Sequence, residues 1–78
     1  MVSSDDIKQW LELGLPDSTI EVMGDDGHHF EALIVSPHFE GKKELQRHRM
    51  VYAVLGDKMQ RDIHALSLKT VTPQEHRK

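Results

Sequence analysis

The chain has 78 residues, a length that fits one small domain with a single hydrophobic core. It contains no cysteine, so it offers neither a disulfide framework nor a thiolate ligand, and any thiolate at a site on this protein must come from a partner. The net charge of −3 divides into one basic and seven acidic side chains in residues 1–30 and nine basic and six acidic ones in residues 31–78, and this overall acidity argues against strong, general polyanion binding.

Residues 3–16 (SSDDIKQWLELGLP) predict a short N-terminal helix. Ser3 or Ser4 is a suitable N-cap, and the two aspartates that follow favour the positive end of the helix dipole. Gly14 and Pro16 are typical stop signals. The apolar side chains fall at helical spacing on one face, which we expect to lie in the core: Ile7, Trp10, Leu11 and Leu15.

The acids of this segment also distinguish it from a signal peptide, which carries basic residues before its apolar run. No apolar stretch of the sequence approaches the length of a transmembrane helix. We therefore expect a cytoplasmic protein without a membrane partner.

Two strands joined by a tight acidic turn are predicted next. Residues 19–23 (TIEVM) alternate in polarity and are rich in β-branched side chains, and residues 29–36 (HFEALIVS) follow the turn GDDG. The short connection favours an antiparallel hairpin. Two adjacent histidines, His28 and His29, then lie where the turn meets the second strand.

Residues 36–41 (SPHFEG) predict a turn, after which residues 43–55 return to helical periodicity. The apolar stripe of this second helix is predicted to consist of Leu45, His48, Val51, Tyr52 and Leu55. Because His48 lies on that stripe, we interpret it as a packed, hydrogen-bonded structural histidine.

Gly56 is expected to interrupt this helix, and Asp57 to cap a short helix that reaches about residue 63. Residues 64–71 (HALSLKTV) predict a third strand, and residues 73–78 a frayed polar tail. The predicted order is helix, strand, strand, helix, short helix, strand, without repeats or internal linkers. Three strands with one face covered by helices form a two-layer α+β sandwich, here a single domain over residues 1–78.

Three sequence blocks carry a family resemblance: GHHFEALIVSP, FEGKKELQRHRMVY and HALSLKT. In this order and at these separations they cover nearly the whole chain and resemble the BolA family, in particular its short YrbA-like bacterial members. The resemblance implies a fold like the class II KH domain, with a three-stranded mixed sheet backed by helices. The sequence TPQEH departs from TPEEW, with which the family pattern usually closes.

The resemblance also implies a partner and a cofactor. BolA-like proteins pair with monothiol glutaredoxins and share a 2Fe-2S cluster with them, to which the glutaredoxin contributes one cysteine and bound glutathione another. The matching ligands in this chain are His64, at the start of the last predicted strand, and either His28 or His29. The chain would then be a non-enzymatic adaptor in iron-sulfur cluster trafficking or assembly, or in iron-status and stress signalling.

Histidine ligands are chemically reasonable at such a site. Neutral imidazole suits iron, and replacing a thiolate with imidazole reduces the negative charge of the cluster. The alternative is that His28 and His29 are ordinary turn and strand-start residues and that His64 caps the preceding helix. Because Phe30 is expected to face the core, alternation turns His29 outward, whereas His28 belongs to the loop. Both loop histidines therefore remain candidates.

A basic cluster surrounds the second predicted helix and consists of Lys42, Lys43, Arg47 and Arg49. The family resemblance associates this region with a helix-turn-helix-like DNA contact, in which these cations would neutralise phosphates. Because glutamates interleave with the cations, a solvated helix face is the alternative. RNA binding of the KH type is disfavoured, since GDDG lies in the hairpin and not at the position of a clamping GXXG loop.

Enzymatic activity is not expected, because the sequence contains no recognisable nucleophile motif, phosphate loop or closed metal motif. We expect a monomer or a weak homodimer in the absence of partners.

Overall fold

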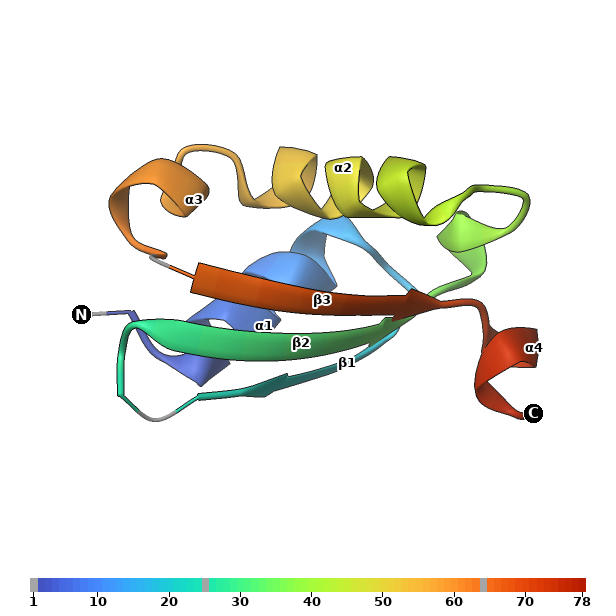
Figure 1. The fold of residues 1–78 in the computed structure, drawn as a ribbon, viewed down its shortest axis with the longest axis horizontal. Helices are drawn as coiled ribbons and strands as arrows, with labels where there is room; N and C mark the ends of the chain where they lie inside the picture. Colours follow the sequence, from blue (N-terminus) through green and yellow to red (C-terminus); the bar gives the residue numbers. More distant parts are fainter. Residues whose placement is uncertain (1, 25, 64) are drawn as a thin grey trace.

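The computed structural model describes residues 2–24, 26–63 and 65–78 (Figure 1). Its elements are α1 (Ser4–Gly14), β1 (Thr19–Met23), β2 (His29–Val35), the 3-10 helix η1 (Pro37–Phe39), α2 (Glu44–Leu55), α3 (Lys58–Arg61), β3 (Ala65–Val71) and α4 (Pro73–His76). The predicted order of helices and strands is confirmed. Two short elements, η1 and α4, appear where the sequence predicts a turn and a frayed tail.

The three strands form one mixed sheet in the order β1-β2-β3. β1 pairs antiparallel with β2, placing Ile20 opposite Ile34, and β2 pairs parallel with β3, placing Phe30 opposite Leu66. The two long helices pack together on one face of this sheet, with α1 against β1 and α2 against β3 (Figure 1). The predicted two-layer α+β sandwich is therefore confirmed.

The first helix begins as predicted, and the structure identifies its cap. The Ser3 hydroxyl accepts a hydrogen bond from the Asp6 amide at 3.1 Å, while the Ser3 amide donates to the Asp6 carboxylate at 2.9 Å. This reciprocal capping box satisfies two amides that the first helical turn would otherwise leave without partners. Ile7 and Leu11 are then held on the buried face of α1.

The segment predicted as a simple turn contributes the largest fully buried side chain, that of Phe39. Ser36 starts η1, because its hydroxyl accepts a hydrogen bond from the His38 amide at 3.1 Å. The resulting 3-10 turn directs Phe39 back into the core, alongside Val51 and Leu55 of α2. The predicted turn is present, but the prediction missed that Phe39, within this polar and proline-containing stretch, is a core residue.

The buried face of α2 differs from the predicted stripe. Val51 is buried as predicted, whereas Leu45 and Tyr52 are exposed. Leu55 is also buried as predicted. Val54, which is outside the predicted stripe, is partly buried and lies against Gly14 of α1, so the buried face of α2 extends toward α1.

His48 is only partly as predicted. Its side chain is half-buried, but Nε2 makes no hydrogen bond within the described residues, and the Glu44 carboxylate oxygen lies 3.6 Å from it. The prediction of a packed histidine is confirmed, and the prediction of a hydrogen-bonded one is wrong in this conformation.

Two boundaries near the end of the chain also differ. Asp57 precedes α3 without a side-chain capping bond, and α3 ends at Arg61. The third strand begins at Ala65, and His64, predicted as its first residue, lies outside the described residues. No helix in residues 2–24, 26–63 or 65–78 has both the length and the apolar character needed to cross a membrane.

The C-terminal segment includes the short helix α4, which makes hydrogen bonds to the rest of the chain. The Thr72 hydroxyl accepts a hydrogen bond from the Glu75 amide, and the Thr72 amide donates to Glu75 Oε1 at 2.8 Å. The same carboxylate accepts two hydrogen bonds from the Arg47 guanidinium, at 2.7 and 3.2 Å. α4 is therefore attached to α2 through a bidentate ion pair.

Glu75→Gln is expected to lower stability at neutral pH and to have little effect in acid. The hydrogen bonds from Arg47, followed by that from the Thr72 amide, lower the pKa of Glu75 from 4.5 to about 2. A carboxyl whose pKa is lower in the folded state stabilises the fold above its unfolded pKa, and that contribution disappears as pH falls toward the folded value. Melting temperatures of parent and variant should therefore differ above pH 4.5 and converge as pH approaches 2.

Glu12→Gln is a suitable control, since it makes the same charge change on the exposed surface of α1. A difference between parent and Glu75→Gln that stays constant from neutral pH to pH 2 would contradict this role of the Glu75 carboxylate.

Candidate functional site

Two of the predicted cluster ligands, His28 and His29, belong to one end of the molecule. In Figure 1 the β1–β2 connection, α3 and the start of β3 lie at the left, while the N-terminal end of α2 lies at the right. His28 and His29 are part of this left-hand end, and the Ala65 amide donates a hydrogen bond to the His28 carbonyl at 3.0 Å. His64, which directly precedes Ala65 in the sequence, is outside the described residues.

Glycines shape the loop that carries these histidines. Gly24 has φ 149°, and a Cβ there would lie 2.5 Å from the His29 carbonyl oxygen and 2.7 Å from Phe30. Gly27, with φ 77°, reverses the chain just before His28. Only glycine adopts such backbone angles at little cost, so the two glycines of GDDG are a structural requirement for bringing the histidines back onto β2.

Asp26 organises this turn through both of its carboxylate oxygens. Oδ1 accepts hydrogen bonds from the amides of His28 and His29, each at 2.8 Å. Oδ2 lies 2.9 Å from Nδ1 of the His29 ring. These contacts, led by the bond from the His29 amide, hold the pKa of Asp26 well below its ordinary value, so the carboxylate is ionised at neutral pH.

Sequence reasoning did not single out Asp26 for this role. The available signal was its spacing: an aspartate at the start of a tight turn can accept hydrogen bonds from amides two and three residues later. Here that spacing also puts a histidine ring within reach of the second oxygen.

His29 has the features of a metal-binding histidine. Its side chain is 76% exposed, as predicted from strand alternation, and Nδ1 is paired with Asp26. No hydrogen bond within the described residues involves its Nε2, so this nitrogen is open to a ligand. A histidine that pairs one ring nitrogen with a carboxylate and presents the other is the usual arrangement at metal sites. These residues therefore fit an imidazole-ligated iron-sulfur cluster.

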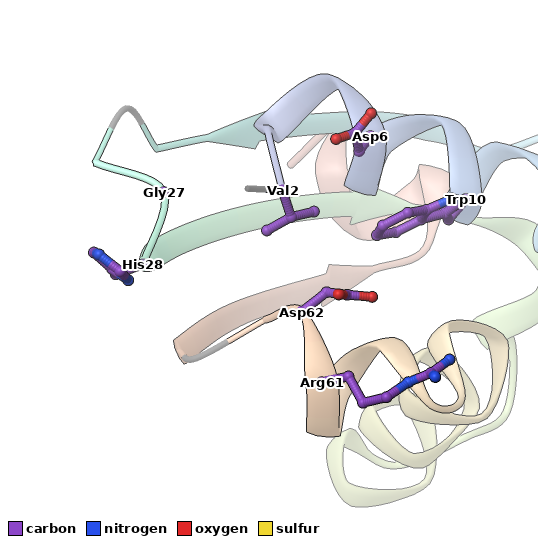
Figure 2. Close-up of a pocket in the computed structure, with 7 residues that line it drawn as sticks. All are labelled: Val2, Asp6, Trp10, Gly27, His28, Arg61 and Asp62. Atoms are coloured by element: carbon purple, nitrogen blue, oxygen red, sulfur yellow. The ribbon is translucent and has the colours of Figure 1, made fainter.

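His28 lies at the edge of an open pocket of about 500 Å³. Figure 2 shows His28 at one end of this pocket and Trp10 toward the other, with α1 above and α3 below. The remaining lining residues are Val2, Asp6, Gly27, Arg61 and Asp62. The Lys58 ammonium lies 4.8 Å from the centre of the Trp10 ring, a cation–π contact that links α3 to α1 beside the pocket.

The described residues contain no group of three or more histidines, aspartates or glutamates that could hold a metal ion. With no cysteine in the chain, a complete set of ligands requires a second molecule.

Arg47 differs from the other three cations of the predicted basic cluster, because its side chain is mostly buried. The Arg47 side chain is 11% exposed and donates hydrogen bonds to the carbonyls of Lys42 and Thr70 as well as to Glu75. Its guanidinium also lies 5.8 Å from the centre of the Phe39 ring. Arg47 is thus committed to internal contacts, which the charge pattern alone did not reveal.

Lys42, Lys43 and Arg49 are exposed. The two lysines directly precede α2, whereas Arg49 lies in the middle of that helix. The N-terminal end of α2, next to Lys42 and Lys43, lies at the end of the molecule opposite to the β1–β2 connection (Figure 1). The two predicted sites are therefore separate surfaces.

Comparison with known proteins agrees with the fold. Residues 16–75 match the family model described as BolA-like protein. The chain is 51% identical over 57 residues to Protein BOLA2 of Arabidopsis thaliana, covering 72% of this chain and 60% of that protein. It is 43% identical over 47 residues to the DNA-binding transcriptional regulator BolA of Escherichia coli, covering 60% of this chain and 45% of that protein. The chain thus spans about half of the length of these curated relatives.

A solved structure of a bolA protein homologue from Coxiella burnetii superposes with a TM-score of 0.91. The two chains are 57% identical, and the alignment covers 100% of each. The arrangement of helices and sheet described above is therefore that of a known family.

Proposed function

This chain belongs to the BolA-like protein family, and from that premise we propose that it is a non-enzymatic cytoplasmic adaptor that shares a 2Fe-2S cluster with a monothiol glutaredoxin. Its role would be the trafficking or assembly of iron-sulfur clusters, or the signalling of iron status. The observation that supports this proposal most directly is the ring of His29, which is paired with Asp26 through Nδ1 and exposed to solvent.

The proposed ligands follow from the histidines that the chain contains and from its lack of cysteine. It offers imidazole nitrogens, from His64 and one of the loop histidines, and no thiolate. The glutaredoxin cysteine and glutathione would supply two thiolates, giving the mixed sulfur and nitrogen ligation known from clusters of higher reduction potential. The hydrogen bond from the Ala65 amide to His28 supports this set, because it joins the loop to the strand that follows His64.

Anaerobic reconstitution tests the proposal. The chain alone, supplied with iron and sulfide, is expected to retain no visible chromophore, because two imidazoles do not complete a cluster. With a monothiol glutaredoxin and glutathione, it should elute as a coloured heterodimer whose spectrum differs from that of the glutaredoxin homodimer. Co-elution without a spectral change, or no co-elution, would contradict the proposal.

DNA binding is the second candidate function, since one relative is named a DNA-binding transcriptional regulator. The supporting observation in this chain is the exposure of Lys42 and Lys43, just before α2, and of Arg49 in the middle of that helix. These side chains would contact phosphates, and such contacts give affinity without sequence preference.

If this second function holds, replacing Lys42, Lys43 and Arg49 together with glutamine should weaken binding to duplex DNA. The slope of log affinity against log salt should become shallower by about 0.9 for each phosphate that the variant no longer neutralises. Fluorescence anisotropy at several salt concentrations provides the measurement. Arg47 is left unchanged, because its replacement would disturb the fold. Equal salt slopes for parent and triple variant would remove DNA binding by this surface.

A further inference from the structure

We infer that Asp26 is a positioning residue that fixes the His29 ring with Nδ1 protonated and Nε2 presented outward, and so selects His29 over His28 as the loop ligand. The selection of a ligand rests on the proposed function. The orientation of the ring rests on the geometry of the loop alone and can be measured without a cluster.

The contact with Asp26 determines which nitrogen of the His29 ring carries the proton. An ionised carboxylate only accepts hydrogen bonds, so the 2.9 Å contact between Asp26 Oδ2 and His29 Nδ1 requires a proton on Nδ1. In the neutral ring, Nε2 then carries the lone pair, which is the form that binds a metal. The amide bonds to Oδ1 keep Asp26 ionised, because they stabilise the charged carboxylate.

Asp26 and His29 are both held by contacts of the main chain. Asp26 is held by two backbone amides, so its second oxygen cannot follow the ring if the ring rotates. His29 is the first residue of β2 and pairs in register with Ala65 of β3. The backbone and the ring of His29 are therefore both fixed relative to the start of β3. An imidazole oriented before binding loses less side-chain entropy on coordination.

Asp26 contacts the two histidines in different ways. The hydrogen bond between Asp26 and His28 is formed by the backbone amide, so it orients the main chain at His28 and not the imidazole. His28 lines the open pocket at the end opposite to Trp10 (Figure 2). Of the two rings, that of His29 is the one that Asp26 orients toward solvent.

Asp26→Asn provides a sharp test. The asparagine carbonyl still accepts both amide hydrogen bonds, so the turn is retained, but the amide NH2 now faces His29 Nδ1 as a donor. The ring should respond by moving its proton to Nε2, which blocks coordination through that atom. Asp62→Asn is the matched control, since it makes the same charge change beside the neighbouring pocket.

The primary readout is the tautomer of His29 in the cluster-free chain, from long-range proton–nitrogen NMR correlations of the ring at a pH where it is neutral. We expect the Nδ1–H form in the parent and in Asp62→Asn, and the Nε2–H form in Asp26→Asn. Circular dichroism melting checks that the variant is folded. An Nε2–H ring in the parent, or a ring unchanged in the folded Asp26→Asn variant, overturns the inference.

The second readout is the mixed complex with glutaredoxin and glutathione. Loss of a carboxylate that orients a histidine ligand typically weakens metal binding by about 10- to 100-fold, so Asp26→Asn should release iron to a chelator correspondingly faster. His28→Ala should behave like the parent. If His28→Ala destabilises the cluster and Asp26→Asn does not, the selection of His29 is overturned. The expected tautomers without any mixed cluster would support the positioning role and overturn the proposed function instead.

Discussion

His64→Ala and His29→Ala are each expected to remove most of the 2Fe-2S cluster from the mixed complex with glutaredoxin. Each substitution deletes one of the nitrogen ligands proposed for this chain, and no cysteine is present to replace it. His64 should show the larger effect, because the family resemblance identifies that ligand most directly. The visible spectrum after gel filtration and the rate of iron release to a chelator measure the effect. For a deleted ligand, we expect iron release to accelerate by more than the roughly 10- to 100-fold typical of residues that only orient a ligand.

His28→Ala and His38→Ala serve as controls. His38 lies on η1, where Nε2 contacts the Pro16 carbonyl at 2.9 Å, and it has no proposed ligand role. A double variant, His64→Ala with His29→Ala, that keeps the parent spectrum and stability would rule out histidine ligation by these residues.

Phe39→Ala is expected to destabilise the domain by about 3–5 kcal/mol, the usual cost of truncating a fully buried phenylalanine. The residue is 0% exposed and lies in the core cluster. Its truncation would also remove the aromatic ring that the Arg47 guanidinium contacts. A core of this size typically supplies a comparable free energy, so the variant should be largely unfolded at room temperature. Urea denaturation followed by circular dichroism measures the difference.

Leu45→Ala is the matched control, since Leu45 is an exposed apolar residue of α2 and its truncation should change stability by no more than about 0.5 kcal/mol. If Phe39→Ala unfolds at the same urea concentration as Leu45→Ala, then η1 does not hold Phe39 in the core in solution.

The main elements could be predicted because their signals are local. The capping serine and the helical spacing of Ile7 and Leu11 identify α1, and β-branched alternation around GDDG identifies the hairpin. The spacing of apolar residues and the residues that form turns are patterns of a few neighbouring positions, so they can be recognised from the sequence without knowing the fold. The boundaries of β1 were predicted to the residue.

The features that escaped prediction depend on partners distant in sequence. Arg47 resembles a surface cation until Glu75 and the Thr70 carbonyl are placed beside it, 28 and 23 residues further along the chain. Phe39 lies in a polar segment whose local composition indicates a turn, and only the packing of α2 shows that it is core. At the candidate site, the histidines were identified by family resemblance, whereas the second oxygen of Asp26 acquires its role only through the folded geometry of the turn.

The loop histidines and the lysines before α2 are far enough apart that their charges should not influence one another. The molecule is 34 Å long, whereas ions at physiological concentration screen exposed charges beyond about 8 Å. Lys42 and Lys43, at the start of α2, therefore exert no appreciable field at the Asp26 turn, and substitutions at the two ends should have additive effects. A glutaredoxin docked at the histidines would leave Lys42, Lys43 and Arg49 facing solvent, so one molecule has room to hold a protein at one end and a polyanion at the other.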